Sequence, residues 1–107
     1  MIAKLKSAAA VNLRTGDTEV YSVSDSSNGA KLSELIIANK TTSQASAIVK
    51  IFKSNIDMTV TILPGVMLLA NEGKVIGMST VLETGDKVII EPSVPGAIDV
   101  LISVIEL

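Results

Sequence analysis

The side chains in this chain that could perform catalysis are carboxylates, lysines and hydroxyls, because its 107 residues include no histidine and no cysteine. Histidine is the usual general base near neutral pH, and cysteine supplies thiolate nucleophiles and zinc ligands. Two acidic pairs, Asp17 with Glu19 and Glu83 with Asp86, have the composition of a glycosidase acid–base pair. Both pairs lie at predicted turns beside strand ends, so we expect solvated turn residues there.

Two further patterns fail on spacing. No Ser-x-x-Lys sequence stands at a turn that leads into a helix, so a serine–lysine dyad is not expected. The segment that begins at Asp25 resembles a calcium loop, but its sixth residue is Ala30 and its twelfth is Ile36, where glycine and glutamate are required. We therefore predict no catalytic residues, no metal site and no cofactor.

The charge and aromatic content disfavour nucleic acid as a partner. The formal net charge is −2, and no basic patch is available to neutralise a phosphate backbone. Tyr21 and Phe52 are the only aromatic residues, so stacking platforms for bases or sugars are scarce. The longest strictly apolar run covers residues 66–70, far less than a membrane span. We expect neither a nucleic-acid nor a membrane partner.

Turn signals recur about every ten residues and divide the chain into short strands. They lie at residues 14–17, 24–29, 39–43, 55–57, 64–65, 71–73, 84–86 and 92–96. This spacing predicts an all-β fold, an antiparallel β-sandwich of jelly-roll or immunoglobulin-like type with about eight short strands. We expect one domain over residues 1–107, with residues 1–11 as an N-terminal strand or arm.

The last segment, residues 97–107, is apolar on both faces of the predicted strand. Ile98, Val100, Ile102 and Val104 share one face, which we predict to be the core face. The opposite face carries Leu101, Ile105 and Leu107, our candidate interface residues. The strand is therefore either central in the sandwich or half-buried by a neighbouring subunit.

Residues 32–38 and 47–53 form two more strands that are apolar on both faces. A polar loop joins them, so we predict that they pair as a hairpin whose surfaces a partner covers. Hydrophobic residues make up 48% of the chain before its 7 glycines are added, above the usual ~45–50% that includes glycine. This excess indicates either apolar surface buried against a partner or a densely packed β core.

Several short motifs resemble those of a known protein class. A strand ends in Ala38-Asn39 before a polar loop, residues 82–86 read Leu-x-x-Gly-Asp, and the last strand closes on the Val-x-Glu of residues 104–106. In these features residues 20–107 resemble the small β-sandwich virion proteins of tailed bacteriophages. The chain departs from that class after Tyr21, where a Ser/Asn/Gly loop replaces a proline-containing turn.

The resemblance implies a non-enzymatic virion protein made in the cytoplasm of a bacterial host. Its implied role is that of a capsid decoration or cement protein, which bridges and stabilises shell subunits. Its partners would be the major capsid protein or other virion proteins, and it would form a homo-oligomer, for which a trimer suits a quasi-three-fold site. The alternatives are a neck, tail or baseplate protein, and a free carbohydrate- or surface-binding module.

Overall fold

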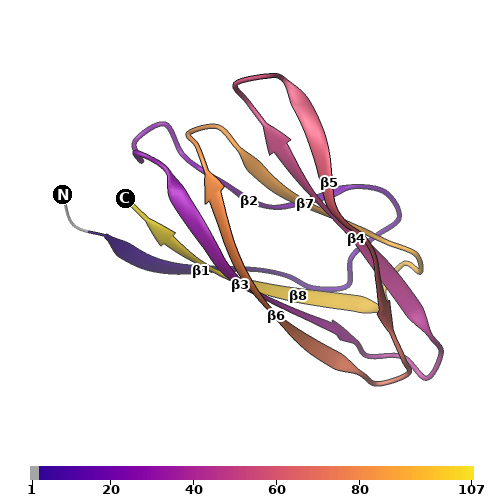
Figure 1. Cartoon of the computed structure of the whole chain (residues 1–107). Coiled ribbons are helices and arrows are strands. Elements are labelled where there is room, and N and C mark those ends of the chain that lie inside the picture. Colours follow the sequence, from indigo (N-terminus) through magenta and orange to yellow (C-terminus); the bar gives the residue numbers. More distant parts are fainter. Residues whose placement is uncertain (1–2) are drawn as a thin grey trace.

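The computed structural model describes residues 3–107 and confirms an all-β sandwich (Figure 1). The strands are β1 (Lys4–Ala10), β2 (Thr18–Ser22), β3 (Ala30–Asn39), β4 (Ala45–Lys53), β5 (Met58–Leu68), β6 (Gly73–Leu82), β7 (Lys87–Pro92) and β8 (Ile98–Glu106). Within the described residues, no helix is long and apolar enough to cross a membrane.

The strands form two antiparallel four-stranded sheets with an interleaved order. Sheet A has the order β1-β8-β3-β6, and sheet B has the order β2-β7-β4-β5 (Figure 1). Strands of the first half pair with strands of the second half as the nested pairs β1·β8, β2·β7, β3·β6 and β4·β5. An antiparallel ribbon folded over in this way is a jelly roll, which decides between the two sandwich types that the sequence leaves open.

The core lies between the inner faces of the two sheets. Ile98, Val100, Ile102 and Val104 of β8 are at most 3% exposed, as their alternation predicts. β8 is a central strand, with β1 on one side and β3 on the other. β1 contributes only the partly buried Ala8 and Ala10 to this core from its described residues, and it pairs with β8 of the same chain.

Seven of the eight predicted turns coincide with the connections between strands, but the turn predicted at residues 64–65 is wrong. Pro64 and Gly65 lie inside β5, where the pairing with β4 shifts register between Ala47 and Lys50. β5 is the edge strand of sheet B, and an edge strand tolerates a proline because one side of its backbone has no partner strand. The irregularity therefore bends a strand that continues through it.

The predicted hairpin between residues 32–38 and 47–53 is also wrong. These segments are β3 of sheet A and β4 of sheet B, so they lie in opposite sheets. Leu35 and Ile37 of β3 and Val49 and Ile51 of β4 are at most 2% exposed and enter the common core from opposite sides. Residues 40–44 bridge the ~10 Å that separates stacked sheets. The true hairpin is β4–β5.

Asn39 anchors this crossing between the sheets. Its side chain is 1% exposed, and its amide nitrogen donates to the backbone oxygens of Ser43 at 2.7 Å and Leu69 at 3.1 Å. Its amide oxygen accepts hydrogen bonds from the backbone nitrogen and the hydroxyl of Thr41, at 3.0 and 2.7 Å. A buried amide with these partners satisfies backbone groups that leave the sheet ladder at the crossing.

Asp86 anchors the opposite end of the sandwich. This residue is fully buried and accepts hydrogen bonds from the backbone nitrogens of Glu83 at 2.8 Å and Ser54 at 3.0 Å, and from the ammonium group of Lys53. Burial alone would raise the pKa of Asp86, but these hydrogen bonds outweigh it and hold the pKa below its usual range. The carboxylate thus ties the β6–β7 turn to the β4–β5 hairpin. The expectation that Asp86 is a solvated turn residue is therefore wrong, because its carboxylate is fully buried among these donors.

We predict that Asp86→Ala lowers the free energy of unfolding by about 3 kcal/mol, because it leaves two backbone donors without their acceptor and leaves Lys53 with Glu83 alone. Urea unfolding at pH 7 measures the change. Asp25→Ala is the matched control, because Asp25 is exposed in the β2–β3 loop, and it should shift stability by less than about 0.5 kcal/mol. Equal effects of the two substitutions would contradict the anchoring role.

Candidate functional site

Lysine side chains bind every member of the two acidic pairs singled out from the sequence. Asp17 forms an ion pair with Lys50 at 2.9 Å, whereas Glu19 pairs with Lys87 at 3.3 Å. Glu83 and Asp86 do lie together, but both contact the ammonium group of Lys53. Each carboxylate is therefore neutralised by an ammonium group within the fold, and the arrangement serves to link strands and turns.

A second buried cluster joins the two sheets at Glu106. This residue continues the core face of β8, is 8% exposed, and accepts a hydrogen bond from the hydroxyl of Tyr21 in β2. The hydrogen bond from Tyr21 and the ion pair with Lys6, at 3.0 Å, hold the pKa of Glu106 below its usual range. Burial and the same hydrogen bond raise the pKa of Tyr21 above its usual range. The cluster clamps sheet B to sheet A.

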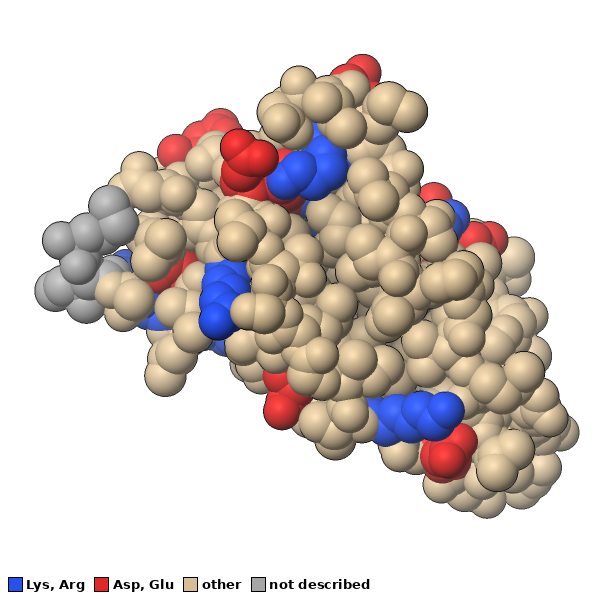
Figure 2. Space-filling model, in the orientation of Figure 1, with Lys and Arg blue, Asp and Glu red and all other residues tan. Residues whose placement is uncertain are grey.

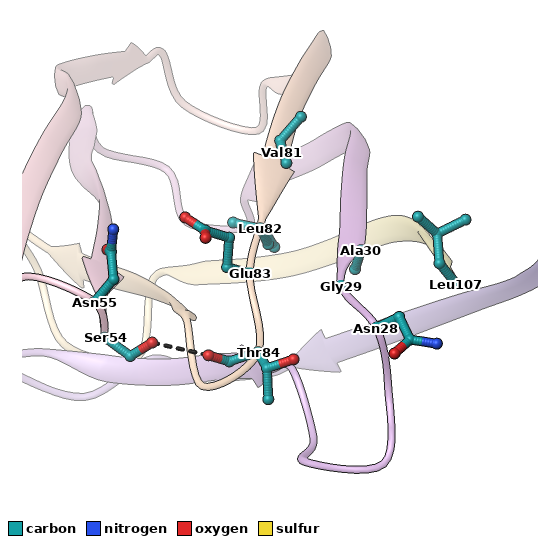
Figure 3. Close-up of a pocket in the computed structure, with 10 residues that line it drawn as sticks. All are labelled: Asn28, Gly29, Ala30, Ser54, Asn55, Val81, Leu82, Glu83, Thr84 and Leu107. Carbon is teal, nitrogen blue, oxygen red and sulfur yellow. Dashed lines mark hydrogen bonds between the residues drawn. The ribbon is translucent and has the colours of Figure 1, made fainter.

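A hollow at one end of the sandwich lies between the ends of β6 and β8 and the hairpin β4–β5 (Figure 3). Its polar groups serve the surrounding turns: the hydroxyl of Ser54 donates to the backbone oxygen of Thr84 at 2.8 Å, and Glu83 pairs with Lys53. Among residues 3–107, no group of three or more acidic side chains could hold a metal ion. The hollow is therefore a concave surface whose polar side chains do not form a catalytic acid–base pair.

The outer face of sheet B carries a network of charges. Lys50 contacts both Asp17 and Glu91, at 2.9 and 3.0 Å. Lys87 pairs with Glu19 and lies over the ring of Phe52, with its nitrogen 5.6 Å from the ring centroid. Figure 2 shows several places where blue and red groups adjoin on the side of the molecule that it draws. The lysines and carboxylates named here are therefore paired with each other within the same chain.

The outer face of sheet A is different, because three rows of side chains cross all four strands with few charges. The strand registers define the rows as follows. The Lys31 row consists of Leu5, Ile105, Lys31 and Val81; the Glu34 row of Ser7, Ser103, Glu34 and Gly77; and the Ile36 row of Ala9, Leu101, Ile36 and Val75.

Large apolar side chains on these rows are strongly exposed. Leu5 is 84% exposed, Val81 71%, Val75 67% and Leu101 41%. Only the Ile36 row is apolar across all four strands, and its β3 member, Ile36, is half-buried. Exposed apolar surface of this kind is a usual mark of an interaction site.

The predicted interface residues are placed on or beside this face. Leu101 and Ile105 belong to its rows, and Leu107 follows the end of β8 with 52% of its surface exposed. The sequence analysis missed Leu5, Ile36, Val75 and Val81 as members of the same surface. The sequence pattern shows which residues of each strand share a face. Only the pairing register shows that these residues form rows with Leu101 and Ile105.

The fold is shared with proteins from virus particles. No family model and no curated protein matches this sequence. A chain of the acid-stable capsid of the Helicobacter pylori bacteriophage KHP30 has a TM-score of 0.66 at 14% identity, with 100% of this chain and 89% of that chain covered. A chain of the T13 particle of infectious bursal disease virus (IBDV) has a TM-score of 0.62 at 10% identity.

The two viral matches differ in extent. The match covers 97% of this chain but only 30% of the IBDV chain, so this chain spans less than a third of that neighbour. The core of the Drosophila protein NLP, whose structure concerns pentamer formation and histone binding, has a TM-score of 0.57 at 11% identity, covering 96% of this chain and 97% of its own. These similarities show a common jelly-roll fold.

We predict that Tyr21→Phe lowers the free energy of unfolding at pH 7 by roughly 1–2 kcal/mol, because Glu106 loses a charge-assisted hydrogen bond. A carboxyl whose folded pKa is lowered stabilises the protein above its unfolded pKa of about 4.3, and this stability is lost as the pH falls through the folded pKa. Because Tyr21→Phe weakens that lowering, denaturant unfolding between about pH 5 and 3 should show a smaller loss than in the wild type. A pH dependence identical to that of the wild type would refute this assignment.

Proposed function

We propose that this chain is a non-enzymatic virion structural protein, and specifically a capsid decoration protein that bridges and stabilises shell subunits. The observation that carries the proposal is a jelly roll with one apolar outer face, of a fold that also occurs, over almost the same length, in a bacteriophage capsid. The sequence motifs that resemble small phage virion proteins support the same role.

The surface chemistry favours protein contacts as the mode of action. Exposed apolar rows gain about 25 cal/mol for each Å² that a partner covers, so many copies add up to a large stabilisation of a shell. The chain has 11 acidic and 9 basic residues. On the outer face of sheet B, lysines and carboxylates form ion pairs with each other. The preferred partner is therefore another virion protein, with the major capsid protein first, in a particle assembled in a bacterial host.

Histone binding, which concerns the NLP core, is less well supported for this chain. A protein that binds basic partners needs a surplus of acidic surface. The net charge is only −2, and the carboxylates Asp17, Glu19 and Glu91 are each already paired with a lysine of the same chain. The virion role needs no such surplus.

Cryo-electron microscopy of the parent particle, with copy number from quantitative mass spectrometry, tests the role directly. We predict density for this chain on the outer shell at a copy number that follows the shell lattice. A dozen or fewer copies at the neck or tail would replace decoration by the alternative virion role. Absence of the chain from purified particles would remove the virion role altogether.

We also predict that particles that lack the chain release their genome at a lower temperature, because apolar burial between shell subunits is lost. Thermal release followed with a DNA-binding dye measures the shift. Adding the purified protein back should restore the transition to its original temperature. Particles that rupture at the same temperature with and without the chain would contradict a cementing role.

A further inference from the structure

The outer face of sheet A is corrugated, because a row of small side chains separates two rows of larger ones. Ser7 and Ser103 of the Glu34 row, together with Ser33 of β3, line a shallow hollow beside Leu5 and Ile105. The Lys31 and Glu34 rows lie two residues apart along β1 and β8, which corresponds to about 6.8 Å. The irregularity between Leu32 and Glu34 places them three residues apart on β3 and four apart on β6. Ridge and groove therefore have the same spacing along β1 and β8, where this face can interlock with a second copy of itself.

Two charges remain unmatched on this corrugated face. Lys31 and Glu34 are the only charged residues in the three rows, and neither forms an ion pair or side-chain hydrogen bond with a described residue. Their neighbour Asp99, one row beyond Leu101, is already paired with Lys40 at 3.1 Å. The face thus presents one free positive and one free negative charge, on adjacent rows of β3.

We propose that two copies of this chain pack sheet A against sheet A around a two-fold axis that lies in the contact plane. The axis runs across the strands, between the Lys31 row and the Glu34 row. Lys31 of each copy then lies opposite Glu34 of the other, and this contact occurs twice because a two-fold interface is isologous. The proposal concerns self-association and does not require the virion role, but it uses the same apolar face, so the dimer and a shell contact through this face exclude each other.

The same axis also matches the sizes of the side chains. It places Leu5 and Ile105 of one copy over the small Ser7 and Ser103 of the other. It brings Leu101 opposite the position of Leu107, which follows β8. Charge and size, two independent properties of the face, therefore select one arrangement.

A neighbouring axis is unfavourable. If the axis lay one row further along, between the Glu34 row and the Ile36 row, Glu34 would face Ile36. A carboxylate buried against an apolar side chain without a partner is strongly destabilising. The alternative therefore loses both the ion pairs and the fit of ridge into groove.

The dimensions of the face predict a weak dimer. Four strands spaced about 4.8 Å apart and about seven residues long give roughly 450 Å² in plan for each copy. The total of about 900 Å² lies near the lower limit of specific interfaces, which is about 1,000 Å². We expect a dimer that forms and dissociates with concentration in the micromolar range, and that leaves the charged outer face of sheet B in solvent.

Sedimentation equilibrium tests the charge pairing through a swap. Lys31→Glu and Glu34→Lys should each raise the dimer dissociation constant at least about tenfold, because each places two pairs of like charges in contact. The double variant Lys31→Glu/Glu34→Lys should restore the wild-type constant. In an equimolar mixture of the two single variants, every contact again joins an acid to a base, so the mixture should dimerise although neither variant does so alone.

Leu101→Asp tests the apolar contact, and Ile56→Asp is its matched control. Ile56 is 55% exposed in the turn of the hairpin β4–β5, away from the rows, so this substitution should leave the mass unchanged while Leu101→Asp yields monomers. Circular dichroism and thermal unfolding check that each variant folds. A wild-type protein that stays monomeric up to millimolar concentration, a trimer, or a variant mixture that does not associate would overturn the proposal.

Discussion

Apolar burial between two stacked sheets is the interaction on which the rest of this structure depends. Every strand has to turn one set of alternating side chains toward the other sheet, and Ile37 of β3, Val49 of β4 and Ile102 of β8 meet that demand with no exposed surface. Because alternation sends every second residue outward, the side chains on the outer faces do not contribute to this core. The composition of the two outer faces can therefore differ: that of sheet B is charged, whereas that of sheet A is largely apolar.

The jelly-roll topology also requires hydrogen-bond partners for the connections, because six of the seven cross from one sheet to the other. Backbone groups at such crossings leave the strand ladders and need other partners. Asn39 and Asp86 provide them at opposite ends of the sandwich, and the contact between Tyr21 and Glu106 links the sheets. The polar residues best placed for chemistry are thus used to hold the fold together.

The contrast between the outer faces gives the strongest functional argument. On sheet B, Lys50 and Lys87 are surrounded by carboxylates from neighbouring strands and loops, which makes a self-sufficient solvated face. On sheet A, exposed leucine and valine side chains lie on β1, β8 and β6, and Lys31 and Glu34 of β3 have no ion-pair partner among the described residues. This contrast is the basis of the proposal that a partner covers sheet A, and the same fold occurs in chains of two virus particles.

The sequence by itself determined the strand content, the core face of β8, seven of the eight turn positions and the scarcity of catalytic groups, because these follow from alternation, local turn chemistry and residue type. It also singled out Leu101 and Ile105. Only the tertiary structure decided that β3 pairs with β6 and β8 rather than with β4, and that Pro64 lies within a strand. Alternation tells which residues of one strand share a face, but it carries no information about which strand lies alongside. For that reason the apolar rows that join Leu5, Ile36 and Val75 to Leu101 and Ile105 emerge only from the register of the folded sheet.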